Sequence, residues 1–235
     1  MPDIPVTFHP FASATELTGQ LADEIATRLL DALTERKQAS LVVSGGSTPK
    51  PLFIELSRKK IDWGKVTITL ADERWVDITD PASNELLVRS LLLQNEAAGA
   101  RFIGLKNSAP TAAEGERDSH TAIAPIPRPF DVVILGMGDD GHTASLFPGA
   151  KQLPEALNMR SGSNCIAITP PDTPHDRMTM TLPTLLDSRE IILHITGNGK
   201  KKVLNRAFGK GSSNDMPVRW VLRQSETPVR IFWAP

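Results

Sequence analysis

The chain has 235 residues, with 26 lysines and arginines against 27 aspartates and glutamates. Because the charges nearly cancel and no basic block is present, an extended polyanion such as nucleic acid is not the expected partner, although a local basic pocket would fit. No apolar run is long enough for a membrane-spanning helix, and the N-terminus lacks the pattern of a signal peptide. The single cysteine excludes an internal disulfide, so we expect a cytoplasmic protein.

Apolar periodicity predicts strands and helices that alternate along the chain. The first strand is expected over residues 6–10, at a sheet edge. From Leu17 to Leu33 the apolar residues recur every three or four positions, which predicts an amphipathic helix. Ser13 or Thr15 would cap the start of this helix.

The next strand, expected over residues 41–44, runs into the segment Ser44-Gly-Gly-Ser-Thr-Pro49. Its glycines open a loop, Ser47 or Thr48 would cap the following helix, and Pro49 suits the first helical position. A glycine-rich turn that leads into a helix N-terminus favours an anion, so an anion cradle is one interpretation and an ordinary capped turn is the other. The spacing does not match a Walker loop.

A charged cluster follows the strand expected over residues 65–70. Asp72, Glu73 and Arg74 come directly after the strand, where charged groups are usually paired. Either the three form a mutually satisfied ion cluster, or Asp72 and Arg74 face a cleft. Ser83 and Asn84 are then interpreted as cap residues of a helix. A short strand, a polar helix and a proline-rich connector follow, over residues 102–105, 109–119 and 125–129.

The strand expected over residues 132–135 precedes the densest polar turn in the chain. Glycines at 136, 138 and 141 alternate there with Asp139, Asp140 and His142. A histidine beside a carboxylate at the end of a buried strand is typical of a catalytic site in an open α/β sheet, and a surface turn is the alternative. The G-x-G-x-x-G spelling is weak evidence for a dinucleotide, because prolines break the following segment and two carboxylates would repel a pyrophosphate.

Four more strands are expected, over residues 165–169, 177–182, 190–196 and 229–233. Arg177 is interpreted as either a surface residue or an anion ligand. Lys200 lies at a helix start, where the helix dipole disfavours a cation, and a bound anion would remove that conflict. His194, within its strand, is interpreted as a satisfied core histidine.

This alternation predicts an α/β fold with a doubly wound, mostly parallel sheet and helices on both faces. The unusual polar groups all follow expected strands, and parallel strands end at one edge of a sheet. We therefore expect these groups to share one site. The chain has no C-x-x-C or H-x-x-x-H spacing, so no metal site is expected.

Taken together, the motifs resemble a known family. They are S-G-G-S-T-P at 44–49, A-D-E-R at 71–74, S-N at 83–84, G-M-G-D-D-G-H-T-A-S-L-F-P at 136–148, R-M-T at 177–179 and G-x-x-K at 197–200. In this order they resemble the 6-phosphogluconolactonases of the glucosamine-6-phosphate isomerase/lactonase superfamily. The resemblance implies one Rossmann-like lactonase domain over residues 1–235, without a nucleotide or other cofactor. It implies hydrolysis of 6-phospho-D-glucono-1,5-lactone to 6-phosphogluconate in the oxidative pentose phosphate pathway.

Under this resemblance the candidate residues take on roles. We expect His142 to act as general base, with Asp140 or Asp72 orienting it, and Arg74 to stabilise an oxyanion or hold the substrate. The residues expected to bind the phosphate are Gly45, Gly46, Ser47, Thr48, Arg177 and Lys200. No metal is required, because a δ-lactone is already a reactive ester. The expected partner is a small sugar-phosphate lactone, bound by a monomer or homodimer without nucleic acid or membrane.

Two other functions are compatible with the same fold. One is a glucosamine-6-phosphate deaminase or isomerase, and the other is a non-catalytic sugar-phosphate sensor. The related deaminases carry a glutamate at the position of Phe147 and a tyrosine at that of Arg74, so both residues argue against amino-sugar deamination. An intact His142 argues against the sensor.

Overall fold

In the computed structural model, which describes residues 6–235, a seven-stranded sheet carries the fold. Its strands run in the order β1-β10-β9-β6-β2-β3-β5, and each neighbouring pair is parallel. The bounds are β1 Val6–Pro10, β2 Ala39–Val43, β3 Val66–Leu70, β5 Arg101–Ile103, β6 Val132–Leu135, β9 Ile191–Thr196 and β10 Val229–Ala234. The predicted α/β fold with a mostly parallel sheet is confirmed.

The strand order reverses between β2 and β6. From β2 the chain builds outward through β3 to β5, and it then returns to place β6 on the other side of β2. In an open α/β sheet, the carboxyl ends of the strands at such a switch point form a crevice for ligands. Here the loops at that point are the glycine-rich segments 44–49 and 136–142.

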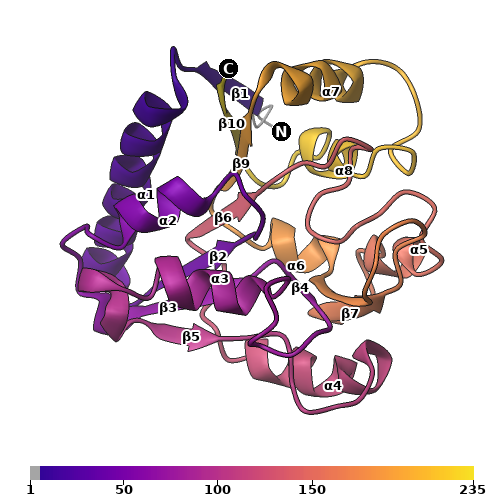
Figure 1. The fold of residues 1–235 in the computed structure, drawn as a ribbon, viewed down its shortest axis with the longest axis horizontal. Coiled ribbons are helices and arrows are strands. Elements are labelled where there is room, and N and C mark those ends of the chain that lie inside the picture. Colours follow the sequence, from indigo (N-terminus) through magenta and orange to yellow (C-terminus); the bar gives the residue numbers. More distant parts are fainter. Residues whose placement is uncertain (1–5) are drawn as a thin grey trace.

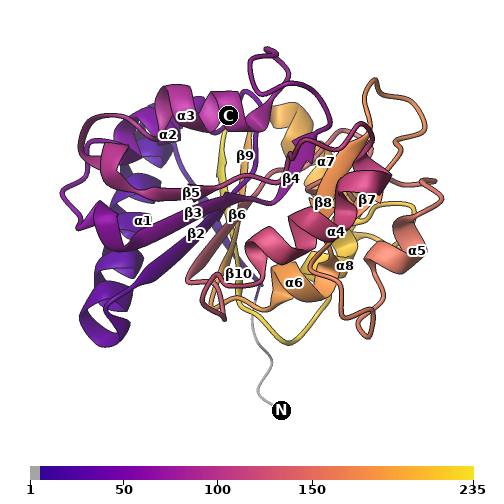
Figure 2. The same cartoon turned by 90° about the horizontal axis from the view of Figure 1, so that it is seen from below.

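Helices cover both faces of the large sheet (Figures 1 and 2). One side carries α1 and α2, and the other carries α6 and α8, whereas α4 packs against the small sheet described below. The helix bounds are α1 Ala14–Arg36, α2 Lys50–Leu56, α3 Asn84–Leu91, α4 Ala112–Ile123, α5 Leu153–Ala156, α6 Leu182–Leu186, α7 Asn198–Phe208 and α8 Val218–Leu222, with short 3₁₀ turns η1 Trp63–Lys65 and η2 Asn95–Gly99. None of the helices within residues 6–235 is long and apolar enough to cross a membrane.

The starts of α1 and α2 differ in how they are capped. Ser13 caps α1 as expected, because its side chain accepts from the backbone N–H of Glu16. The expected cap of α2 is wrong: Pro49 occupies the N-cap position, and neither Ser47 nor Thr48 caps the helix through its side chain. A tight turn explains the difference, since the carbonyl of Ser47 accepts from the N–H of Lys50. The hydroxyl groups of Ser47 and Thr48 are thereby free of the helix.

A second, three-stranded sheet is not part of the predicted parallel arrangement. It consists of β4 (Asp72–Arg74), β8 (Arg177–Met180) and β7 (Cys165–Ile168), paired antiparallel in the order β4-β8-β7. The physical reason lies in the connection between β7 and β8, which is a short loop. Parallel neighbours need a crossover of a dozen or more residues, whereas antiparallel neighbours do not. Arg177 therefore begins a strand instead of following one.

Candidate active site

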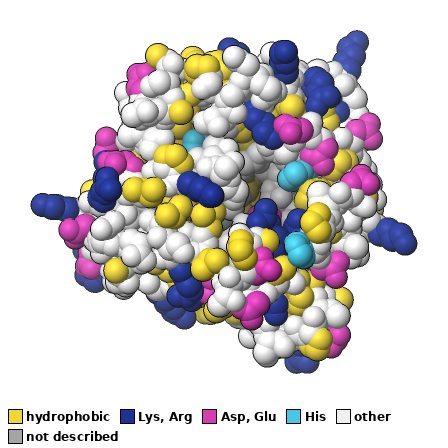
Figure 3. Space-filling view, viewed as in Figure 1, with side chains coloured by type: hydrophobic (Ala, Val, Ile, Leu, Met, Phe, Trp, Pro, Cys, Tyr) yellow, Lys and Arg dark blue, Asp and Glu magenta, His cyan; other side chains and the backbone are white. Residues whose placement is uncertain are grey.

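The loops at the carboxyl ends of the parallel strands enclose a cavity of about 360 Å³. A space-filling view shows a hollow near the middle of this face, with basic side chains inside it and histidines on its rim (Figure 3). Most of the predicted site residues line this cavity, namely Gly45, Gly46, Ser47, Thr48, Asp72, Arg74, His142 and Lys200. Asp140 and Arg177 are not among the lining residues.

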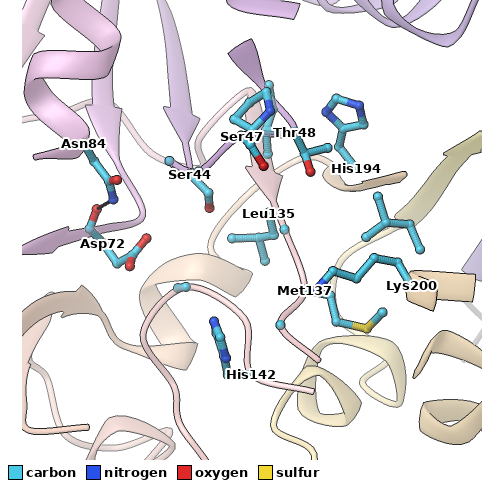
Figure 4. A pocket seen from close by; sticks show the side chains of 18 of the residues that line it. Ser44, Ser47, Thr48, Asp72, Asn84, Leu135, Met137, His142, His194 and Lys200 are labelled. Carbon is cyan, nitrogen blue, oxygen red and sulfur yellow. Dashed lines mark hydrogen bonds between the residues drawn. The ribbon is translucent and has the colours of Figure 1, made fainter. Parts of the chain in front are cut away.

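His142 reaches into the cavity opposite Ser47 and Thr48, with Asp72 and Lys200 on the two flanks (Figure 4). Ser47 and Thr48 belong to the loop after β2, and His142 belongs to the loop after β6. These two loops lie next to each other because β2 and β6 are neighbours at the switch point. The expectation that polar groups after separate strands would share one site therefore holds for these residues.

Asp140 holds the imidazole of His142 from behind. Its Oδ1 lies 2.6 Å from Nδ1 of the ring and accepts from the backbone N–H of the same histidine at 3.0 Å. Burial works to raise the pKa of Asp140, but the hydrogen bonds from His142 outweigh it and hold that pKa below its ordinary value. With Nδ1 engaged, Nε2 is the ring nitrogen left to exchange a proton with a ligand.

Two neighbours fix the place of the His142 ring. A Cβ atom added to Gly138 would lie 2.2 Å from both Cε1 and Nδ1 of His142, so only glycine leaves room for the imidazole. On another side the ring packs against Phe147, with 4.3 Å between the ring centroids. Phe147 therefore supplies an apolar contact to the imidazole.

Asp72 contacts Ser145 and not His142. The hydroxyl of Ser145 donates to Oδ2 of Asp72 at 2.6 Å, and the carboxylate borders the cavity. Of the two candidate carboxylates, the structure thus places Asp140 against the imidazole. Across residues 6–235, no three histidine, cysteine, aspartate or glutamate side chains are grouped as metal ligands would be.

The charged cluster at 72–74 divides between two faces of β4, so the interpretation of a mutually satisfied ion cluster is wrong. Glu73 points away from the cavity, and its carboxylate accepts from the backbone N–H groups of Arg74, Asn84 and Glu85. Burial raises the pKa of Glu73 despite these donors. Asp72 and Arg74 face the cavity, as expected.

Arg74 and Arg177 lie opposite each other on β4 and β8. Arg74 donates to the carbonyl of Ala82. Arg177 donates to the carbonyls of Pro174 and His175, and both of these hydrogen bonds are 2.8 Å long. Burial, followed by the nearby guanidinium of Arg74, lowers the pKa of Arg177. Among the salt bridges between described residues, none includes either arginine. The carboxylates of Asp72, Glu73 and Asp176 lie near enough to act on Arg177 in the opposite sense, and Arg177 is buried and does not line the cavity.

Lys200 borders the cavity near the start of α7, where it forms an ion pair with Asp139. Its Nζ lies 2.7 Å from Oδ1 of that carboxylate. Asp139 therefore supplies the negative charge that the sequence led us to expect from a bound anion. An incoming phosphate would meet Lys200 already paired with an exposed carboxylate.

Ser44, Asn84 and His194 are among the cavity residues that were not predicted as site residues. Each has a buried side-chain atom without a hydrogen-bond partner among residues 6–235, namely Oγ, Oδ1 and Nδ1 respectively. The interpretation of His194 as a satisfied core histidine is wrong in this respect, and burial lowers its pKa to about 4. Ser44 and Asn84 stood in recognised motifs, but their position beside a strand end or helix start also fits ordinary capping. No local sequence pattern indicates the missing hydrogen-bond partners.

A sequence model of one family, described as "Glucosamine-6-phosphate isomerases/6-phosphogluconolactonase", matches residues 12–233. The chain belongs to this family. It is 44% identical over 227 residues to the 6-phosphogluconolactonase of Rhizobium meliloti (strain 1021), covering 97% of this chain and 98% of that protein. It is 42% identical to the 6-phosphogluconolactonase of Pseudomonas aeruginosa, with coverage of 98% and 95%.

Solved structures extend the family likeness to three dimensions. The crystal structure of a 6-phosphogluconolactonase from Shewanella baltica matches with a TM-score of 0.96 and 47% sequence identity, covering 99% of each chain. A monomeric glucosamine-6-phosphate deaminase matches with a TM-score of 0.79 at 20% identity. The match to the deaminase shows only that this chain has the same fold as that protein.

Proposed function

We propose that this chain hydrolyses 6-phospho-D-glucono-1,5-lactone to 6-phospho-D-gluconate in the oxidative pentose phosphate pathway. The observation that carries the proposal is the shared cavity. His142, held by Asp140, lies on one side, the glycine-rich cradle lies opposite, and Lys200 lies on a flank between them. A general base and an anion site at opposite ends of one cavity suit a substrate that has both an ester carbonyl and a phosphate. The relatives bearing this activity's name match over nearly the full chain.

His142 acts as the general base in the proposed mechanism. Nε2 takes a proton from water as the water oxygen forms a bond to C1 of the lactone. Asp140 stabilises the imidazolium that results, because its carboxylate already contacts Nδ1. When the bond between C1 and the ring oxygen breaks, the same nitrogen returns the proton to that oxygen. The product is the open-chain acid, and the imidazole is neutral again.

The remaining cavity residues bind charge. Backbone N–H groups of Gly45 and Gly46 and the hydroxyls of Ser47 and Thr48 hold the phosphate, and Lys200 leaves Asp139 to pair with it. Arg74 stabilises the oxyanion that develops at C1. Arg177 contributes positive charge from behind the cavity wall.

No structural observation favours the deaminase alternative. The ring of Phe147 packs on His142, and this side chain has no titratable group that could transfer a proton. We further propose that residues 1–235 act as one lactonase domain, as a monomer or homodimer, in the cytoplasm. The one cysteine, Cys165, is buried and burial raises its pKa to about 12, which fits a thiol that stays reduced.

A coupled assay tests the function. Glucose-6-phosphate is oxidised enzymatically to the lactone, and formation of 6-phosphogluconate is followed with and without the protein, against spontaneous hydrolysis. We expect a large acceleration that is lost in His142→Ala. If folded protein gives no acceleration, the proposed function is wrong, and ammonia release from glucosamine-6-phosphate becomes the next measurement.

A further inference from the structure

The side chain of Asn84 fills the space next to Gly45 of the phosphate cradle. A Cβ atom added to Gly45 would lie 1.8 Å from Oδ1 and 2.3 Å from Cγ of Asn84. Contacts so short are impossible, so residue 45 can be only glycine while Asn84 is present. The backbone at Gly45 lies outside the left-handed region, and the requirement for glycine therefore comes from Asn84 and not from the turn.

The same amide also holds the backbone at Asp72. Nδ2 of Asn84 donates to the carbonyl of Asp72 at 2.8 Å, and Figure 4 shows the two residues joined in this way beside Ser44. Asn84 thus touches the loop after β2 with its oxygen and the first residue of β4 with its nitrogen. The loop carries the phosphate cradle, and β4 carries a cavity carboxylate.

Asn84 is itself rigidly placed. It is the first residue of α3, it is 2% exposed, and its backbone N–H donates to Glu73 at 2.7 Å. The Glu73 carboxylate also accepts from the N–H of Glu85 and the hydroxyl of Ser83, so it holds the whole helix start. Oδ1 of Asn84 has no hydrogen-bond partner among the described residues. A polar atom kept buried without a partner is unfavourable, and here that atom lies against Gly45.

We propose that Asn84 is a positioning residue that sets the distance between the phosphate cradle and the reacting end of the cavity. The inference rests on the proposed lactonase function, because that substrate is anchored by its phosphate while it reacts at C1. A displacement of about 1 Å between anchor and reacting atoms is enough to lower a rate about a hundredfold. Asn84 prevents such a displacement by bracing Gly45 against the backbone of Asp72.

Substrates with and without a phosphate distinguish positioning from a general structural role. Only the phosphorylated lactone uses the span from the cradle to C1. We expect Asn84→Ala to lower kcat/KM for 6-phosphoglucono-1,5-lactone by about tenfold more than for unphosphorylated glucono-1,5-lactone. Thermal unfolding of each variant separates this effect from loss of folded protein. Equal losses for the two lactones would overturn the proposal.

A double-mutant cycle tests the contact itself. Gly45→Ala alone should abolish most activity on the phosphorylated lactone, because its methyl group collides with Asn84. In the double variant Gly45→Ala/Asn84→Ala the collision is gone, so activity should rise above that of Gly45→Ala alone. Gly46→Ala is the matched control: its Cβ meets nothing within 4 Å but its φ is +99°, so Asn84→Ala should not rescue it. Additive losses in the Gly45 cycle would overturn the proposal.

The same variants separate this inference from the proposed function. If the wild-type protein accelerates no lactone hydrolysis, the function fails, and binding of inorganic phosphate is then measured by NMR titration. The inference predicts that Gly45→Ala weakens phosphate binding and that Asn84→Ala restores it in the double variant. Unchanged phosphate binding in Gly45→Ala would show that this contact does not position the cradle.

Discussion

Two histidines border the same cavity in opposite surroundings. His142 lies in the glycine-rich turn 136–142, with 29% of its side chain exposed and Nδ1 on Asp140. His194 lies inside β9, is 3% exposed, and has no partner for Nδ1 among the described residues. Burial lowers the pKa of His194 and keeps its imidazole neutral, whereas the imidazole of His142 contacts a carboxylate. Position at a cavity is therefore not enough to make a histidine a base.

The largest expected effect compares the two histidines directly. His142→Ala should lower kcat by about 10²- to 10⁴-fold, because it removes the proposed general base. His194→Leu should lower kcat by less than about tenfold, since a neutral buried ring without a partner does no proton transfer. Steady-state kinetics on the phosphorylated lactone measure both. Similar losses of kcat in the two variants would show that the two histidines do not differ in their role in catalysis.

The environment of His142 can be disturbed without replacing it. Gly138→Ala should lower kcat by about 10- to 100-fold, because its methyl group occupies the place of the imidazole. Gly136→Ala is the matched control in the same turn, since a Cβ there meets nothing within 4 Å. Both variants should fold. Equal activity in the two would mean that the ring does not need the space beside Gly138.

Much of this arrangement follows from local sequence pattern. The apolar run 132–135 predicted β6, and alternation of strands and helices predicted a parallel sheet whose carboxyl ends meet. The pattern did not distinguish β7 and β8 from strands of the large sheet, because apolar periodicity reports burial and not the pairing partner. The Gly45–Asn84 contact and the missing partner of His194 arise from chain segments far apart in sequence. No local pattern records them.

The low pKa of His194 should make the stability of the protein depend on pH. Its pKa is about 4 in the folded protein, against an ordinary value of 6.5. Between these values the unfolded chain binds a proton that the folded chain excludes, so the free energy of unfolding falls as the pH drops through this window and is regained above it. A shift of this size corresponds to about 3 kcal/mol.

Urea unfolding between pH 7 and pH 4 measures this contribution. Wild-type protein should lose about 3 kcal/mol more than His194→Leu across the window, because the other titrating groups are common to both proteins. The same pH slope in the two proteins would show that His194 titrates at its ordinary pKa.

The smallest expected effect concerns the ion pair that joins the two regions. Asp139 belongs to the turn of His142, Lys200 follows β9, and the pair lies at the cavity edge. Asp139 is 86% exposed, and exposed pairs contribute at most about 1 kcal/mol, so Asp139→Asn should lower KM for the phosphorylated lactone by up to about fivefold. The kcat should not change, because the contact between Asp140 and His142 is untouched.

Salt dependence and a charge-preserving variant make this last prediction specific. Asp139→Glu keeps the competing carboxylate and should leave KM near the wild-type value. The gain in Asp139→Asn should shrink in about 0.3 M salt, because exposed charges are then screened. Inhibition by inorganic phosphate should strengthen in parallel with the fall in KM. A higher KM in Asp139→Asn would mean that Asp139 holds Lys200 in place for the substrate, so the turn and β9 would cooperate in binding and not compete.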